Sequence, residues 1–150
     1  MSENIEQARA KYAFDKAKGV PDKDKKNYKN YVKSLPMLIK SSGFGSAMAN
    51  VFVKSKKEKA YEYIYNHINE WLIKKNIIVI ENNNKDKELA ENIVNLDSEK
   101  YRFATLEVLE LLKWSRRFAE GLCPPDKKDN KSSDEQSASS ENSEVLNNNA

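Results

Sequence analysis

The side chains that most enzymes use for covalent or metal chemistry are scarce in this chain. His67 is the only histidine, and Cys123, the only cysteine, lies beside Pro124 at the start of a polar C-terminal segment. We therefore predict neither a Cys-His nucleophile pair nor a histidine-based metal site. Glu107 and Glu110 lie three residues apart, which places two carboxylates on one helical face, but we interpret them as a solvated edge. The sequence S-S-G-F-G-S at residues 41–46 lacks the spacing and the lysine of a phosphate-binding loop. We therefore predict a protein that is not an enzyme, with no catalytic residues, no metal site and no cofactor.

Basic residues are concentrated in the first part of the chain. Residues 1–59 contain 14 lysines and arginines against 6 acidic residues, residues 60–123 contain 9 against 11, and residues 124–150 contain 3 against 6. A basic surface suits a phosphate backbone, because each neutralised phosphate releases counterions. A general bias toward lysine and asparagine would produce the same surface without a ligand, so charge alone leaves both interpretations open.

Arginines and aromatic residues offer two further modes of binding. The adjacent Arg116 and Arg117 follow Trp114 near the end of a predicted helix, where cations are favoured by the helix dipole, and they suit either a phosphate clamp or an ion pair with a partner. Aromatic side chains can stack on bases, but most of those in this chain fall on apolar helical stripes, which favours core packing. These residues are Tyr12, Tyr28, Tyr31, Tyr61, Tyr65, Trp71 and Trp114.

The elements that must position these residues are predicted to be organised around residues 31–53, the most apolar continuous segment of the chain. Ser34 is predicted to cap a helix whose first turn contains Pro36, where a missing N–H costs nothing. Gly43 ends this helix, because glycine adopts the left-handed conformation at a helix C-terminus without a steric penalty. A second helix of small residues is predicted to follow over residues 46–53.

Apolar residues at three- and four-residue spacing predict several more helices. The first is capped by Asn4 and the last and longest by Asp97 or Ser98. Residues 77–80 are β-branched, but no second strand is available to pair with them, so we expect an apolar segment that tucks against the core. The further predicted helices span residues 3–18, 24–33, 57–75, 86–94 and 98–121.

These elements predict an all-α fold, a single compact bundle of about five to six helices over residues 1–123. Residues 124–150 are almost devoid of apolar side chains and are predicted to be a disordered, acidic, Ser/Asn-rich tail. No apolar run approaches the length of a membrane span, and the N-terminus lacks the pattern of a signal peptide. We therefore expect a cytoplasmic protein without a membrane partner.

Four stretches of this sequence together resemble the small α-helical subunit of the type III-B (Cmr) CRISPR effector complexes. The most specific parts are L-P-x-L-I with a following glycine, and the ending T-x-E-x-L-x-x-L-x-W-x-x-R-F-A. The sequence departs from the family in its long acidic tail and in F-G-S, where a step like L-G-Q is more usual. The four stretches cover residues 8–14, 33–49, 61–72 and 101–121.

The resemblance implies a non-catalytic subunit that stacks in several copies as a minor filament. Its implied partners are the other Cmr complex subunits, copies of itself, and the guide RNA and target RNA, which it would hold through phosphates without reading sequence. Lys16 and Lys29 are added as contact residues from charge and helical facing alone. The motif match proposes RNA or subunit contacts for Arg9, Lys33, Lys40, Arg116 and Arg117.

Two alternatives remain open. One is the equivalent small subunit of a type III-A complex. The other is a helical DNA-binding regulator, because the corner at Gly43 resembles a helix-turn-helix. The helix after this corner begins S-A-M-A-N at residues 46–50, which offers one amide and no arginine to base edges. Sequence preference would separate these alternatives, since only the regulator predicts a specific duplex.

Overall fold

Six helices make up the part of the chain that the computed structural model describes, namely residues 4–80 and 88–125. No strand occurs within those residues, which confirms the predicted all-α bundle. The predicted tail beyond residue 125 lies outside the described residues, and the division of the chain at residue 123 stays a prediction. The helices are α1 (Ile5–Gly19), α2 (Asp22–Ser42), α3 (Phe44–Ser55), α4 (Lys59–Lys74), α5 (Leu89–Val94) and α6 (Ser98–Leu122).

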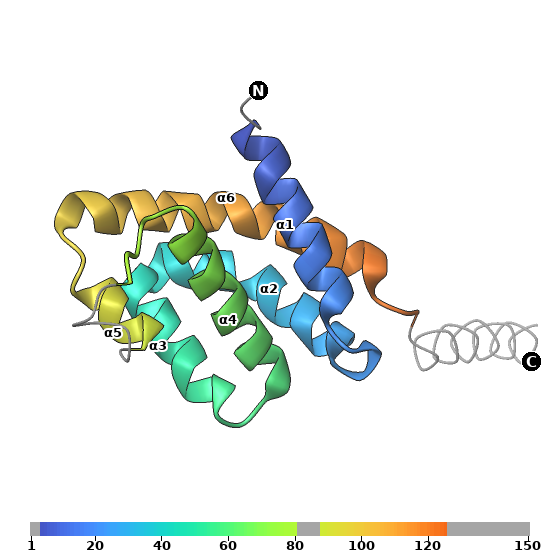
Figure 1. Cartoon of the computed structure of the whole chain (residues 1–150). Coiled ribbons are helices and arrows are strands. Elements are labelled where there is room, and N and C mark those ends of the chain that lie inside the picture. The colour runs from blue at the N-terminus through green and yellow to red at the C-terminus, as the bar shows by residue number, and fades with distance from the viewer. Residues whose placement is uncertain (1–3, 81–87, 126–150) are drawn as a thin grey trace, which may run out of the picture.

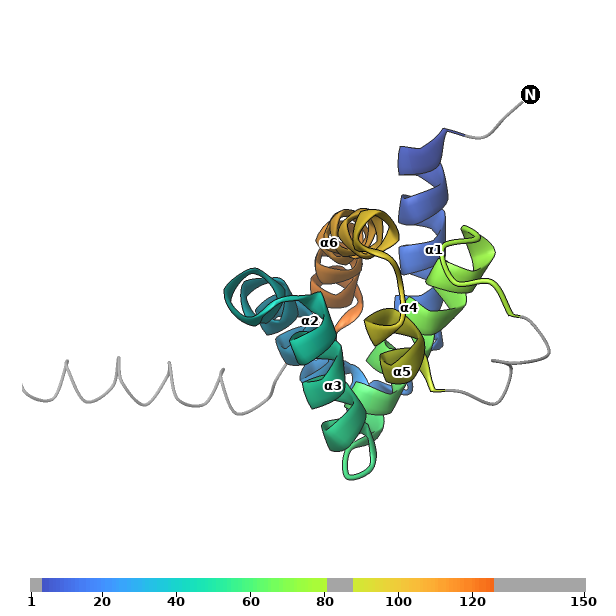
Figure 2. The ribbon, with the colours of Figure 1, turned by 90° about the vertical axis from the view of Figure 1, so that its left-hand side faces the viewer.

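The last and longest helix, α6, runs along one edge of the bundle, and α2 to α5 lie to one side of it (Figure 1). Both α1 and α2 pack against it, and Figure 2, which looks along α6, shows them on opposite sides of it. This explains the wide apolar surface that the sequence shows in this helix. Asp97 caps α6 as predicted, with its Oδ1 accepting from the Lys100 N–H at 2.8 Å.

The main core lies between α2, α3, α4, α5 and α6, and a smaller cluster lies between α1, α4 and α6. Phe44, Met48 and Ile93 are fully buried in the main core. Trp71, also fully buried, belongs to the smaller cluster together with Ala13. Burying these large apolar side chains supplies most of the driving force for packing the helices together.

The predicted helix boundary at Ser34 is wrong, because α2 runs without interruption from Asp22 to Ser42 with Pro36 inside it. Ser34 does not cap a helix but donates from its hydroxyl to the carbonyl of Tyr31 at 3.1 Å. A proline inside a helix removes one hydrogen bond. The stripe of buried residues on α2 continues across it to Ile39, so packing on both sides of Pro36 outweighs the lost bond.

The segment that follows α4, and α5 itself, differ in part from expectation. Asn76 lies just after α4 with a φ of 59°, and the Ile77 N–H donates to the Leu72 carbonyl at 3.0 Å, which closes the helix end. In the β-branched run, Ile77 and Ile78 are buried, but the last two residues are about half exposed. Val94, the last residue of α5, is 65% exposed, and residues 86–87 of the predicted helix lie outside the described residues.

None of the helices within the described residues combines the length and the hydropathy needed to cross a membrane.

The turn between α2 and α3 depends on two glycines and Tyr101. Gly43 has φ 90° and ψ 156°, a conformation that L side chains rarely adopt. Gly45 lies in the first turn of α3 and donates its N–H to the Tyr101 hydroxyl at 2.7 Å. A Cβ on Gly45 would approach that same oxygen to 3.3 Å. The backbone conformation therefore favours glycine at position 43, and the close contact favours it at position 45.

Replacing Gly43 tests this turn. We expect Gly43→Ala to lower the free energy of unfolding by about 1–3 kcal/mol, because the alanine is strained at this φ. Gly121→Ala is the matched control, since Gly121 lies in α6 with open space around it; it should be neutral or stabilising by up to about 1 kcal/mol. Urea denaturation measures both. A Gly43→Ala variant as stable as the wild type would contradict this explanation.

Candidate nucleic-acid and subunit interface

Arg9 is held by a two-point ion pair that joins α1 to α6. Its Nε and Nη2 donate to Oε1 and Oε2 of Glu107 at 2.9 and 2.8 Å, an arrangement that suits the planar guanidinium. The Arg9 side chain is 12% exposed and that of Glu107 is 7% exposed. Arg9 therefore has its main partner inside the bundle. Its predicted role in contacting RNA or a subunit stays a prediction, and this geometry does not favour it.

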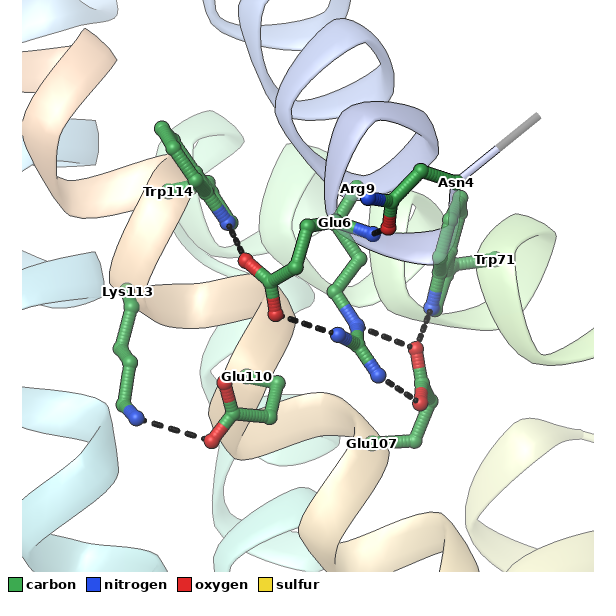
Figure 3. A network of polar contacts seen from close by, with 8 residues as sticks. All are labelled: Asn4, Glu6, Arg9, Trp71, Glu107, Glu110, Lys113 and Trp114. Atoms are coloured by element: carbon green, nitrogen blue, oxygen red, sulfur yellow. Dashed lines mark hydrogen bonds and ion pairs between the residues drawn. The ribbon is translucent and has the colours of Figure 1, made fainter.

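The ion pair is the centre of a polar network that includes both tryptophans (Figure 3). Trp71 of α4 donates from Nε1 to Glu107 Oε1 at 3.0 Å. Arg9 also donates to Glu6 Oε1 at 2.7 Å, and the other oxygen of Glu6 accepts from Trp114 Nε1 at 3.1 Å. The network thus fixes α1, α4 and α6 relative to one another.

The interpretation of Glu107 and Glu110 as a solvated edge is wrong for Glu107. Burial by itself would raise the pKa of the Glu107 carboxyl. The hydrogen bonds from Arg9 and Trp71, with the Arg9 charge, outweigh this and hold that pKa below its ordinary value. Glu110 fits the interpretation better, since it accepts from Lys113 Nζ at 2.8 Å with 38% of its side chain exposed.

His67 belongs to a second polar cluster beneath α1. Its Nδ1 is hydrogen-bonded to the Tyr28 hydroxyl at 2.9 Å, and its backbone carbonyl accepts from the Tyr12 hydroxyl at 2.5 Å. Burial, with a smaller contribution from the charge of Lys16, lowers the pKa of His67 to about 4. The imidazole is therefore neutral near pH 7, and its contacts are with side chains inside the bundle.

A row of lysines runs along the outer face of α2. Lys26, Lys33 and Lys40 follow one another at seven-residue intervals and are all exposed, which places them on the same face of the helix. We call these three residues the α2 lysine row. Within the described part of the chain neither Lys33 nor Lys40 has a carboxylate partner. Lys29, half-buried, lies beside the row four residues before Lys33.

Lys16, Arg116 and Arg117 lie on other helices than the α2 lysine row, and each has a neighbour within the chain. Lys16 pairs with Glu70 at 2.5 Å. Arg116 reaches Glu120 of its own helix at 3.5 Å, an exposed contact that contributes little to stability. The guanidinium of Arg117 lies over the ring of Trp114, 5.2 Å from its centre. The two adjacent arginines thus have different neighbours within the chain, and their role in a phosphate clamp or in an ion pair with a partner stays a prediction.

Sequence reasoning missed the continuity of the α2 lysine row. Lys33 and Lys40 were proposed as contacts, but Lys26 was not. The seven-residue spacing can be read from the sequence. It was overlooked because the row crosses the wrongly predicted helix boundary at Ser34.

Within residues 4–80 and 88–125, no group of three or more His, Cys, Asp or Glu side chains is arranged to hold a metal ion.

Two comparisons with known proteins agree with each other. A family model described as CRISPR-associated protein (Cas_Cmr5) matches residues 5–122. The fold is similar to the crystal structure of a CRISPR-associated Cmr5 family protein from Thermus thermophilus, with a TM-score of 0.63 and 23% sequence identity. That match covers 81% of this chain and 100% of the Thermus chain. At this identity the structural likeness shows the fold alone.

The Arg9–Glu107 pair gives a test of what holds α1 in place. We expect Glu107→Gln to lower the free energy of unfolding by about 3 kcal/mol at pH 7, because it leaves a largely buried arginine with only the more exposed Glu6 as a counter-charge. Since the folded-state pKa of Glu107 is depressed, the stability it supplies is present above its ordinary pKa of 4.5 and lost as pH falls through the folded value. The variant should lack that acid-dependent loss.

Denaturant titrations at several pH values measure this effect, with Glu110→Gln as the control. The control removes an exposed pair and should change stability by less than about 1 kcal/mol. A Glu107→Gln variant that behaves like the control at pH 7 and at acid pH would contradict a structural role for the pair.

Proposed function

This chain belongs to the family of CRISPR-associated proteins described as Cas_Cmr5, and from this membership we propose that it is the small, non-catalytic subunit of a type III-B (Cmr) ribonucleoprotein effector in antiviral defence. In this proposal several copies stack as a minor filament beside the larger Cmr subunits. Together they hold the duplex of guide RNA and target RNA through its phosphates.

The observation that supports RNA binding best is the α2 lysine row. Seven residues of α-helix rise about 10.5 Å, so the row extends over about 21 Å. A linear array of ammonium groups suits a polymeric anion better than a small one. Lysine approaches phosphate as a point charge, and contacts to phosphates carry no sequence information, so the expected binding is independent of sequence and sensitive to salt.

The surface of α3 gives less support to a DNA-binding regulator. In a helix-turn-helix, α3 would be the helix placed in the major groove. Phe44, Ala47, Met48 and Val51 on this helix are buried in the core. The remaining exposed positions of its first turns carry no arginine or lysine.

Stacking between subunits requires apolar surface, and α6 exposes some. Phe103 and Leu106 lie three residues apart on this helix and are each 58% exposed. Exposed large apolar side chains on one face are typical of protein contacts. We therefore propose that the first half of α6 contacts a neighbouring protein subunit, while the α2 lysine row contacts RNA.

Neutralising the α2 lysine row tests the proposal. We expect Lys33→Gln/Lys40→Gln to weaken binding to guide–target RNA duplexes of unrelated sequence by roughly tenfold at about 50 mM salt, and to reduce the slope of log affinity against log salt by about 1 to 2. Lys57→Gln/Lys100→Gln, which removes the same charge from exposed positions outside α2, should have a smaller effect. Fluorescence anisotropy measures both quantities.

Equal losses in the two double variants would indicate a general charge effect and contradict the assignment of α2. Preference for one DNA duplex sequence over the RNA duplexes would contradict the CRISPR function and favour the regulator.

A further inference from the structure

A basic pocket lies between α1 and the end of α4, apart from the α2 lysine row. Figure 2 shows α1 and α4 next to each other, and none of the residues that line the pocket comes from α2. The pocket has a volume of about 410 Å³. Its walls are formed by residues of one face of α1 and by the two lysines at the end of α4. The lining residues are Ala8, Lys11, Tyr12, Asp15, Lys16, Lys74 and Lys75.

The charge of this pocket is strongly positive. Four of the lining residues are lysines and one, Asp15, is an aspartate, so the lining carries a net charge of +3. Glu70, which pairs with Lys16, reduces the local charge by one further unit. Like charges brought together in a partly enclosed space repel one another, and an anion between them would relieve this repulsion.

Three of the four ammonium groups are held in position by aromatic rings. The Nζ atoms of Lys16 and Lys74 lie 5.4 and 5.8 Å from the centre of the Tyr12 ring, and Nζ of Lys75 lies 4.8 Å from the Trp71 ring. These distances are typical of cation–π contacts. The lysines are therefore partly ordered before any ligand arrives, which reduces the entropy lost on binding.

The two rings are themselves fixed by hydrogen bonds. Tyr12 donates to the backbone carbonyl of His67, and Trp71 donates to Glu107 in the central network. The ring faces remain available to the lysines, because both hydrogen bonds use the polar edge of the side chain. The pocket is thus built on the same contacts that dock α1 onto the bundle.

We propose that this α1–α4 pocket binds a backbone phosphate of RNA. The inference rests on the proposed function and deepens it by adding a second, separate RNA contact. Phosphate is the chemistry that suits the pocket, since four lysines line it and the lysine ammonium group donates readily to phosphate oxygens. A single pocket of this kind holds one position of the strand and does not read its bases.

Nuclear magnetic resonance of the full, isotope-labelled chain tests the pocket and the α2 lysine row separately. Titration with a single-stranded hexanucleotide RNA at about 50 mM salt should shift the amide signals of Lys74 and Lys75 along a saturating curve, independently of those of Lys33 and Lys40. Separate arms with inorganic phosphate and with AMP, matched for phosphate concentration, distinguish the RNA backbone from free ions and nucleotides. Both should bind far more weakly than RNA.

Two variants sharpen this test. Lys74→Gln/Lys75→Gln should weaken RNA binding at the pocket by roughly tenfold, as expected for lost phosphate contacts at low salt, and leave the α2 shifts intact. Because Lys75 also packs on Trp71, Lys11→Gln/Lys74→Gln provides a second variant that keeps this contact and should show the same loss. Lys57→Gln/Lys100→Gln should leave both sets of shifts unchanged.

The possible results separate this inference from the proposed function. RNA-induced shifts at α2 with none at the pocket, or pocket shifts that persist in both variants, would overturn the inference and leave the proposed function standing. If RNA shifts the signals neither of the pocket nor of α2, RNA binding by this chain would be overturned altogether. Saturation of the pocket by AMP or inorganic phosphate at the same phosphate concentration as RNA would overturn its assignment to the RNA backbone.

Discussion

The docking of α1 depends on the ion pair between Arg9 and Glu107. The two residues are separated by 98 positions in the chain, so their contact closes the bundle by bringing its first helix onto its last. Both side chains are largely buried, and removing either charge deprives the other of its main counter-charge. Trp71 adds a third helix to the same carboxylate. The position of α1 in turn creates the basic pocket against α4.

The network also divides the cations of the chain into two classes. Arg9 is bound to carboxylates within the protein, whereas Lys33 and Lys40 lie on an outer helix face without a carboxylate partner in the described part of the chain. Only cations of the second class can neutralise a polyanion without first losing an internal ion pair. This distinction cannot be made from charge counts, which treat the two classes alike.

Local signals in the sequence predicted most of the helices, because caps and apolar spacing act within a few residues. Asp97 caps α6 and Gly43 ends α2, as the residue types indicate. Pro36 misled the prediction, since packing along the whole of α2 outweighs one missing hydrogen bond. The burial of Glu107 could not be predicted either, because its partner comes from the opposite end of the chain. The resemblance to the Cmr small subunit, carried by motifs rather than by periodicity, is confirmed by the family match over residues 5–122.

Affinity purification of the tagged full chain from its host, with mass spectrometry of the proteins and sequencing of the RNA that co-purifies, tests the central functional claim most directly. The account predicts recovery together with the large subunits of a type III-B CRISPR effector and with short guide RNAs. Recovery of the chain alone, or with genomic duplex DNA and no CRISPR subunits, would contradict it.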